Sequence, residues 1–80
     1  MTVYVVKMPK IGDLTSSCLL LTWLVSVGAE VEQGSPMAVV ETDKVQAEVP
    51  SPVQGVVTEL LAEENDEVAV GRPICRLESL

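Results

Sequence analysis

The sequence predicts an all-β fold, a sandwich or flattened barrel of antiparallel strands, and three features support this prediction. Valine, which favours strands, is abundant, whereas Phe is absent. Short apolar segments are separated by Gly and Pro, and no segment has a helical period. Residues 45–49 alternate, with Val45, Ala47 and Val49 facing one way and Gln46 and Glu48 the other, as in an antiparallel strand with one buried face.

The pattern places the strands and one crossover. Strands are expected at residues 2–8, 18–27, 36–42, 45–49, 54–62 and 73–78, with short strands near 30–32 and 67–69. Trp23 lies in the most apolar run and is expected in the core between the sheets. Pro50-Ser51-Pro52 cannot donate to a central ladder, so it is expected to cross from one sheet to the other.

An internal repeat indicates two similar halves. At an offset of 37 residues the chain pairs Glu30 with Glu67, Val31 with Val68, Gly34 with Gly71, Pro36 with Pro73, and Glu41 with Glu78. Gly28 falls opposite Asn65, and these residue types tolerate positive backbone φ best, as a tight connection requires. The sequence therefore predicts two copies of one strand unit, related by quasi-two-fold symmetry.

Length and charge restrict the function. The 80 residues form one small domain, 1–80, with a modest core and no room for a cleft between lobes. The net charge of -7 makes nucleic acid an unsuitable partner, because phosphate contacts need clustered Lys and Arg. The apolar run from Cys18 to Val25 is too short to span a bilayer, and no secretory signal precedes it, so no membrane partner is expected.

The two cysteines do not point to metal or nucleophilic chemistry. Cys18 and Cys75 are far apart in sequence, and the chain has no His, which excludes a Cys-His or Ser-His arrangement. A zinc site needs about four ligands, so none is expected. We predict two reduced, buried thiols.

Lys44 lies in a short polar segment between two expected strands, which places it at the exposed tip of a hairpin. A lysine there is commonly just a solvated side chain, but an exposed tip also suits covalent attachment. The flanking residues distinguish these interpretations. The segment Glu41-Thr42-Asp43-Lys44-Val45, followed by Val49-Pro50-Ser51-Pro52-Val53-Gln54-Gly55, resembles the lipoyl domain of 2-oxo acid dehydrogenase acyltransferases. The resemblance extends from Met8-Pro9-Lys10-Ile11-Gly12 to Gly71-Arg72-Pro73.

This resemblance implies a fold and a set of site residues. It implies two antiparallel sheets of about four strands each, with the lysine hairpin at one end and both termini near the other. It implies that Lys44 carries lipoate in amide linkage. It associates Glu41, Asp43, Val45, Gly28 and Gly55 with correct modification or presentation of the lysine, although the glycines have structural explanations as well. The family's partner-recognition loop corresponds to Asp13, Leu14, Thr15, Ser16 and Ser17, where this chain is less acidic than the family pattern.

The resemblance also implies a function and partners. The chain is expected to be a carrier rather than an enzyme, modified by a lipoate-attaching enzyme. A thiamine-diphosphate-dependent decarboxylase then acylates the arm reductively, an acyltransferase core receives the acyl group, and dihydrolipoamide dehydrogenase reoxidises the dithiol. The 80 residues are expected to be a monomeric, N-terminal part of a longer acyltransferase. The expected location is the bacterial cytoplasm, or the mitochondrial matrix after removal of a targeting segment.

Two other functions remain open at this point. A biotinyl carrier domain has a related fold but places methionine on both sides of its lysine, whereas Asp43 and Val45 flank Lys44 here. The glycine-cleavage carrier is a longer relative, and its pattern fits this chain less well. An unmodified β-domain that only binds partners is the second alternative.

Overall fold

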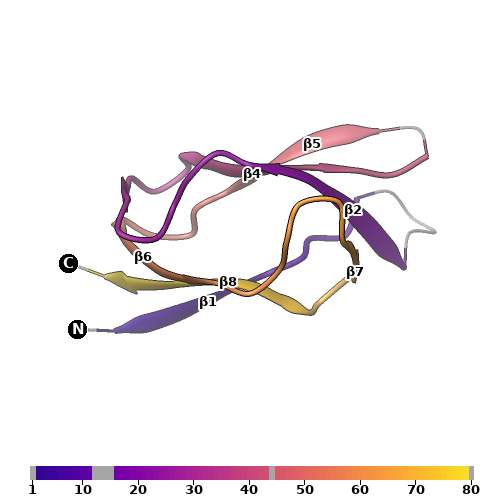
Figure 1. Ribbon diagram of the computed structural model, residues 1–80. Coiled ribbons are helices and arrows are strands. Elements are labelled where there is room, and N and C mark those ends of the chain that lie inside the picture. Colours follow the sequence, from indigo (N-terminus) through magenta and orange to yellow (C-terminus); the bar gives the residue numbers. More distant parts are fainter. Residues whose placement is uncertain (1, 12–15, 44, 80) are drawn as a thin grey trace.

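Two four-stranded antiparallel sheets pack face to face in the computed structural model of the chain, which describes residues 2–11, 16–43 and 45–79 (Figure 1). The strands are β1 (Val3–Lys7), β2 (Ser17–Trp23), β3 (Glu30–Val31), β4 (Pro36–Glu41), β5 (Gln46–Pro50), β6 (Gly55–Leu60), β7 (Glu67–Ala69) and β8 (Pro73–Ser79). One sheet has the order β1-β8-β6-β3 and the other β5-β4-β2-β7; we call them sheet A and sheet B. The described residues contain no helix, so the predicted all-β sandwich is confirmed.

Every expected strand is present within one residue of its predicted bounds, except that two strands end earlier by two residues or more. β2 ends at Trp23 instead of residue 27, and β6 ends at Leu60 instead of residue 62. The apolar pattern continues past these ends because Val25 and Ala62 still pack against the core from the loops. Hydropathy therefore reports burial there, and it does not report strand pairing.

The quasi-two-fold symmetry is visible in the backbone. The repeat maps β2 onto β6, β3 onto β7 and β4 onto β8, and these strands take equivalent places in the two sheet orders. A bulge lies between Leu20 and Thr22 in one half and between Val57 and Glu59 in the other, again 37 residues apart. The predicted positive φ is found at both loop positions, +94° at Gly28 and +73° at Asn65.

These two loops are anchored in the same way. The Gly28 N–H donates to the Val57 carbonyl at 2.8 Å, and the Asn65 N–H donates to the Leu20 carbonyl at 2.7 Å. Leu20 and Val57 are themselves partners in the repeat. Each half therefore ties its loop to the bulged strand of the other sheet, which couples the two sheets.

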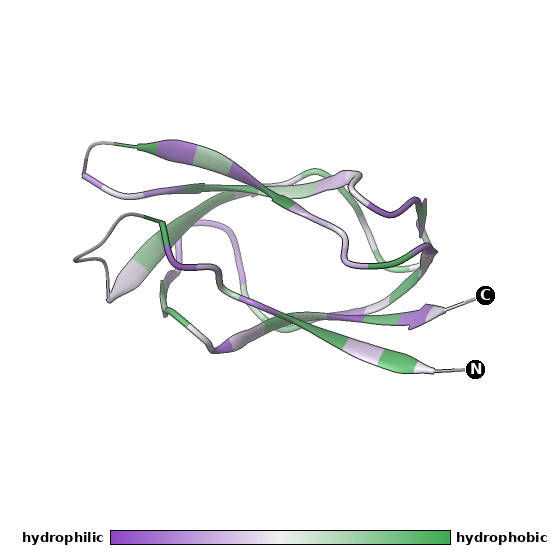
Figure 2. Cartoon of the chain, turned by 180° about the vertical axis from the view of Figure 1, so that it is seen from behind, coloured by the Kyte–Doolittle hydropathy of each residue, from purple (hydrophilic) through white to green (hydrophobic). Residues whose placement is uncertain are grey.

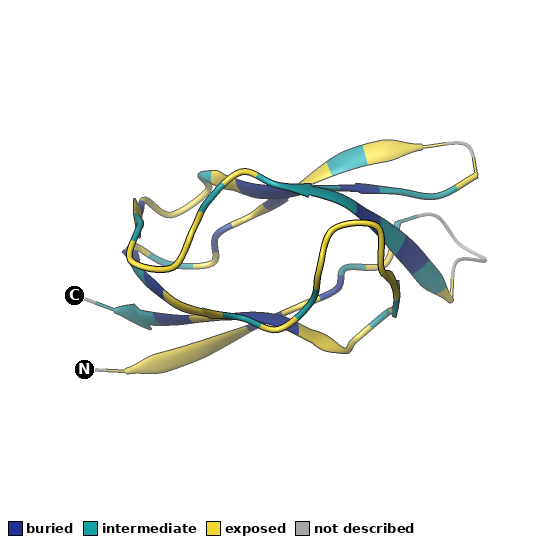
Figure 3. Ribbon diagram, in the orientation of Figure 1, coloured by how far each residue is buried: buried dark blue, intermediate teal, exposed yellow. Residues whose placement is uncertain are grey.

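The core lies between the sheets and consists of aliphatic and sulfur-containing side chains (Figure 3). Figure 2 shows hydrophobic and hydrophilic residues alternating along the strands, as expected when each sheet has one buried face. The buried apolar residues are Val6, Met8, Cys18, Leu20, Val31, Met37, Ala38, Val40, Val49, Val57, Ile74, Cys75 and Leu77.

The expectation that Trp23 lies within this core needs correction. Its side chain is only half-buried and packs against the edge of the core. The indole Nε1–H donates to the Ala62 carbonyl at 2.9 Å. The indole N–H needs an acceptor, and the loop after β6 supplies one at the edge of the core. The aliphatic side chains inside the core would offer it no acceptor.

The crossover between the halves agrees with the prediction. Pro50 ends the edge strand β5, and residues 51–54 lead into β6 of the other sheet. The buried Ser51 is fully bonded, because its hydroxyl donates to the Val53 carbonyl and its N–H to the Ser35 carbonyl. Among the described residues, no helix has the length and apolar character needed to cross a membrane.

Candidate functional site: the β4–β5 hairpin

The site is built on the hairpin that joins β4, an inner strand of sheet B, to the edge strand β5. β4 pairs with β5 on one side and β2 on the other, and its inward-facing Ala38 and Val40 are fully buried. The hairpin therefore has a base fixed in the core and an end that reaches solvent. Figure 1 shows this end and the start of β2 together at one end of the molecule, with both chain termini at the other, as the resemblance implied.

The turn itself is closed by its flanking residues. The Thr42 N–H donates to the Val45 carbonyl at 2.8 Å, and the Thr42 hydroxyl approaches the same oxygen at 3.5 Å. Asp43 is exposed, and Val45 exposes 45% of its surface although it is aliphatic. The predicted attachment residue Lys44 lies between them in the sequence and outside the described residues.

Glu41 occupies the last pair of the ladder before the turn. It pairs with Gln46, whose side-chain amide donates to the Glu41 carboxylate at 3.4 Å, and on its other side it faces Leu19. The structure thus gathers three of the predicted modification residues, Glu41, Asp43 and Val45, at the hairpin end.

The two predicted glycines lie away from this end. Gly55 pairs with Ser79 near the C-terminus, and an added Cβ would collide with the carbonyl of Glu78. Gly28 has φ +94° in the loop after β2. Their contacts explain them as structural positions, and the structure does not bring them beside the hairpin.

The predicted partner loop is described only at its C-terminal end. Asp13, Leu14 and Thr15 lie outside the described residues. The Ser16 carbonyl accepts the Val70 N–H at 3.0 Å, and the Ser17 hydroxyl donates to Glu67 Oε2 at 2.6 Å. The start of β2 is therefore tied to β7, which the sequence pattern did not reveal because the partners are about fifty residues apart.

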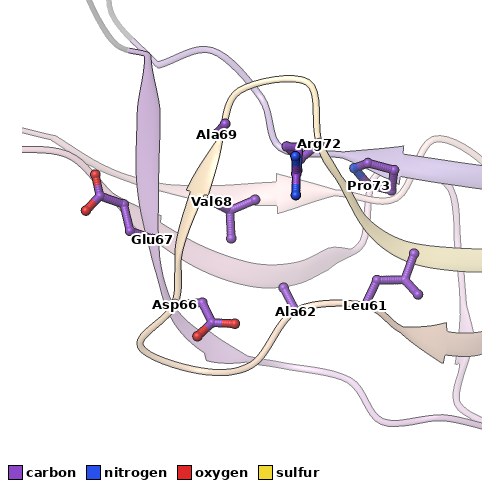
Figure 4. A pocket seen from close by; sticks show the side chains of 8 residues that line it. All are labelled: Leu61, Ala62, Asp66, Glu67, Val68, Ala69, Arg72 and Pro73. Carbon is purple, nitrogen blue, oxygen red and sulfur yellow. The ribbon is translucent and has the colours of Figure 1, made fainter.

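A second feature at β7 is an open cavity of about 410 Å³ (Figure 4). Its walls are Leu61, Ala62, Asp66, Glu67, Val68, Ala69, Arg72 and Pro73. The lining combines apolar side chains with the charged groups of Asp66, Glu67 and Arg72. No group of three or more possible metal ligands occurs within residues 2–11, 16–43 and 45–79.

Comparison with known proteins identifies the family. The Biotin_lipoyl family, described as "Biotin-requiring enzyme", matches residues 4–77. The chain belongs to this family. The match to a biotinyl/lipoyl domain therefore covers almost the whole chain.

Curated relatives of this biotinyl/lipoyl domain are acyltransferase components. It is 44% identical over 72 residues to the dihydrolipoyllysine-residue acetyltransferase component of the Corynebacterium glutamicum pyruvate dehydrogenase complex. It is 40% identical over 79 residues to the lipoamide acyltransferase component of the Bacillus subtilis branched-chain alpha-keto acid dehydrogenase complex. These matches cover 90% and 99% of the chain, but only 11% and 19% of the relatives.

Solved structures agree. The lipoyl domain of the Azotobacter vinelandii 2-oxoglutarate dehydrogenase complex matches with a TM-score of 0.76 and 28% identity, covering 94% of this chain and 95% of that one. A single-chain, multi-domain long-chain acyl-CoA carboxylase matches with a TM-score of 0.83 at 15% identity, covering 98% of this chain and 7% of that one. The carboxylase shares the fold alone.

Proposed function

We propose that the chain is a lipoyl carrier domain of a 2-oxo acid dehydrogenase acyltransferase, in which Lys44 bears lipoate in amide linkage. The observation that carries this proposal is the exposed hairpin, closed by the Thr42–Val45 hydrogen bond, which presents Asp43 and Val45 on either side of Lys44 in the sequence. The match of almost the whole chain to dihydrolipoyllysine acyltransferases supports the same role. The domain is part of a longer protein and has no catalytic activity of its own.

The residues of the hairpin fit such a role. The Thr42–Val45 hydrogen bond fixes the turn, and the buried Val40 anchors β4, so an attached arm would swing from a rigid base. Glu41 and Gln46 form a polar pair at the base of the turn, where an attaching enzyme would meet it. Attached lipoate supplies a dithiolane whose disulfide accepts an acyl group and two electrons, so the hard chemistry belongs to the cofactor and partner enzymes.

The partners follow from this role. They are a lipoate-attaching enzyme, a thiamine-diphosphate-dependent decarboxylase, an acyltransferase core and dihydrolipoamide dehydrogenase. Tethering within one complex raises the effective concentration of the carrier at each active site, so individual contacts can be weak. Relatives from pyruvate, branched-chain and 2-oxoglutarate complexes match at similar identity, between 40% and 44%, so identity does not single out one 2-oxo acid.

A biotinyl carrier is the second candidate, because the family also contains biotin-dependent proteins and the carboxylase shares the fold. One experiment separates the two. The chain is incubated with a lipoate-attaching enzyme, lipoate and ATP, and in parallel with a biotin-attaching enzyme, biotin and ATP. We expect intact mass to show one lipoyl group per chain and no biotin, with the lipoyl group on the Lys44 peptide.

The variant Lys44→Ala should remain unmodified, whereas Lys7→Ala and Lys10→Ala should be lipoylated like the parent. These two controls remove the same charge from exposed positions outside the hairpin. Lipoylation of Lys44→Ala, or comparable yield at Lys7 or Lys10 in the parent, would refute the assignment.

A further inference from the structure

Strand β1 lies at one edge of sheet A and carries apolar side chains on its outward face. Val6 is buried, whereas Val3 and Val5, which alternate with it, expose 57% and 44% of their surface. β1 pairs with β8 on one side only, so among the described residues its other edge is open. An exposed apolar strand with an open edge is suited to pairing with a further strand.

The internal repeat supplies a comparison strand that is protected against such pairing. β5 pairs with β4 as β1 pairs with β8, so Gln46 is equivalent to Val3. In the same way, Glu48 is equivalent to Val5. Both residues of β5 are exposed and polar, and the strand ends at Pro50. Charged residues and proline keep edge strands from pairing with other chains, and β1 lacks this protection at its two outward valines.

The backbone groups at the open edge belong to the outward residues of β1. The Thr2 carbonyl accepts a hydrogen bond from the end of β8, and the Met8 N–H donates to the residue before β8, each at 2.9 Å. Alternate residues of an antiparallel strand direct their N–H and C=O groups to opposite edges. The N–H and C=O groups of Val3, Val5 and Lys7 therefore point to the open edge.

A second copy of β1 fits this edge in an antiparallel register centred on Val5. In that register Val5 lies opposite Val5 of the other copy, and Val3 lies opposite Lys7. All three outward residues then exchange backbone hydrogen bonds across a two-fold axis. On the inner side Tyr4 lies opposite Val6, and an aromatic side chain opposite a β-branched one stabilises paired strands. The edge is therefore complementary to itself.

The same register brings opposite charges together. Within one copy Glu78 pairs with Val3, so Lys7 of the other copy faces Glu78 across Val3 on the outward face. The strand spacing puts these two backbones about 10 Å apart, a gap that a Lys and a Glu side chain bridge. Neither Lys7 nor Glu78 takes part in an ion pair within the part of the chain that the structure describes. The two-fold axis forms this contact twice, so the charge on β1 favours a second copy.

We propose that the β1 strands of two copies of this chain pair to form a symmetric dimer, in which sheet A continues from one copy into the other. The dimer goes beyond the carrier function and does not rest on it, because no residue of the β4–β5 hairpin takes part. It differs from the monomer that the family resemblance leads us to expect. An interface of one short strand per copy is small, so a dissociation constant between micromolar and millimolar is expected.

Sedimentation equilibrium of the 80-residue chain measures this dissociation constant. It is carried out at physiological ionic strength, where repulsion between the net charges of -7 is screened beyond about 8 Å. The double variant Val3→Gln/Val5→Glu gives β1 the outward side chains of β5 and places like charges opposite each other at the axis. We expect its dissociation constant to rise at least about tenfold, with the circular dichroism spectrum of the parent.

The control is Leu24→Gln/Val27→Glu. It makes the same two kinds of change, and adds the same charge, at exposed apolar positions outside β1. Its dissociation constant should equal that of the parent.

Charge-swapped variants test the register. Lys7→Glu and Glu78→Lys each place like charges at the contact, so each variant alone should associate more weakly than the parent. When the two are mixed, a heterodimer has opposite charges at both contacts. Association in the mixture should be about five- to tenfold tighter than for either variant alone.

A parent that stays monomeric up to millimolar concentration would overturn the proposal. An equal loss of affinity in both double variants would also overturn it, because the contact would then lie outside β1. A mixture of the charge-swapped variants that associates no more tightly than its components would reject the two-fold register.

Discussion

Cys18 and Cys75 show how a single buried side chain ties stability to pH. Both are free thiols in the core, on strands of different sheets, as the sequence predicted for their burial. Burial raises the pKa of the Cys75 thiol from 9.0 to about 11. Burial also raises the pKa of Cys18, but a backbone hydrogen bond from Ile11 acts in the opposite direction. Neither thiol is therefore suited to act as a thiolate at neutral pH.

The decrease in the free energy of unfolding at alkaline pH should depend on Cys75. Because the folded-state pKa of Cys75 is raised, the stabilisation that comes from its protonated thiol is complete below pH 9 and is lost as the pH rises toward 11. The unfolded chain ionises first, so the free energy of unfolding should fall by up to about 1.4 kcal/mol per pH unit in this window. Denaturant unfolding of the parent at pH 7, 8, 9 and 10 should show this slope, and Cys75→Ala should flatten it.

Cys18→Ala serves as the comparison, because the opposing backbone hydrogen bond should make its effect on the slope smaller. Identical slopes in the parent and Cys75→Ala would mean that the thiol ionises without cost in the folded state.

At the scale of elements, the sequence predicts the β4–β5 hairpin well and the loops poorly. The hairpin is predictable because alternation over residues 45–49 meets a polar turn, and Ala47 and Val49 face the core as expected. Val45, which was expected on the same face, is exposed because it lies in the turn before β5 begins.

The structural explanations given for the two glycines hold, because Gly28 lies in a loop with positive φ and Gly55 lies where two strands approach closely. Their separation from the hairpin end depends on strand order, which no local pattern encodes. The outward position of Leu19 could have been inferred from alternation with Cys18 and Leu20.

The loop after β6 is held by contacts that sequence periodicity cannot reveal. Glu64 Oε2 accepts the Thr22 hydroxyl at 2.7 Å and the Trp23 N–H at 2.9 Å, across about forty residues of sequence. The Trp23 indole bonds to Ala62 of the same loop. The hydrogen bond from Thr22, followed by that from Trp23, lowers the pKa of the Glu64 carboxyl. The Glu64 carboxylate therefore fixes this loop to the last two residues of β2 by hydrogen bonds.

Glu64→Gln should lower the melting temperature at pH 7 by a few degrees, because a neutral amide accepts these hydrogen bonds less strongly. Since the folded-state pKa of Glu64 is lowered, its stabilisation is present above the usual value of 4.5 and is lost as the pH falls through the folded-state pKa. The parent should thus lose more stability than Glu64→Gln between pH 7 and pH 3. Thermal melts of the parent and Glu64→Gln at both pH values measure this difference in stability loss. The variant Glu63→Gln, at the exposed neighbouring position, is the control. A Glu63→Gln effect as large as that of Glu64→Gln would rule out the specific contact.

At the scale of the whole molecule, the two-fold repeat relates the hairpin turn to the chain ends. The Thr42 N–H donates to Val45 across the turn, and at the equivalent place the Ser79 N–H donates to the Thr2 carbonyl at 2.9 Å. The Thr2 N–H also donates to the Ser79 hydroxyl at 3.2 Å. The symmetric fold thus has two equivalent ends, one closed by the predicted attachment turn and one open at the termini of this 80-residue chain.

Joining the two ends of this chain should therefore stabilise it without disturbing the site. A short glycine linker between Leu80 and Met1 would close a gap that the Thr2 and Ser79 hydrogen bonds already span, so little strain is introduced. Covalent closure restricts the unfolded chain, and loop-closure entropy puts the gain at about 2 to 4 kcal/mol. The measurement is the urea midpoint of the backbone-cyclised domain against a linear chain with the same linker residues at its C-terminus. Lipoylation at the opposite end should proceed at an equal rate in both. A cyclic form no more stable than the linear one would mean that the ends separate in solution, and the symmetry argument for the turn would lose its support.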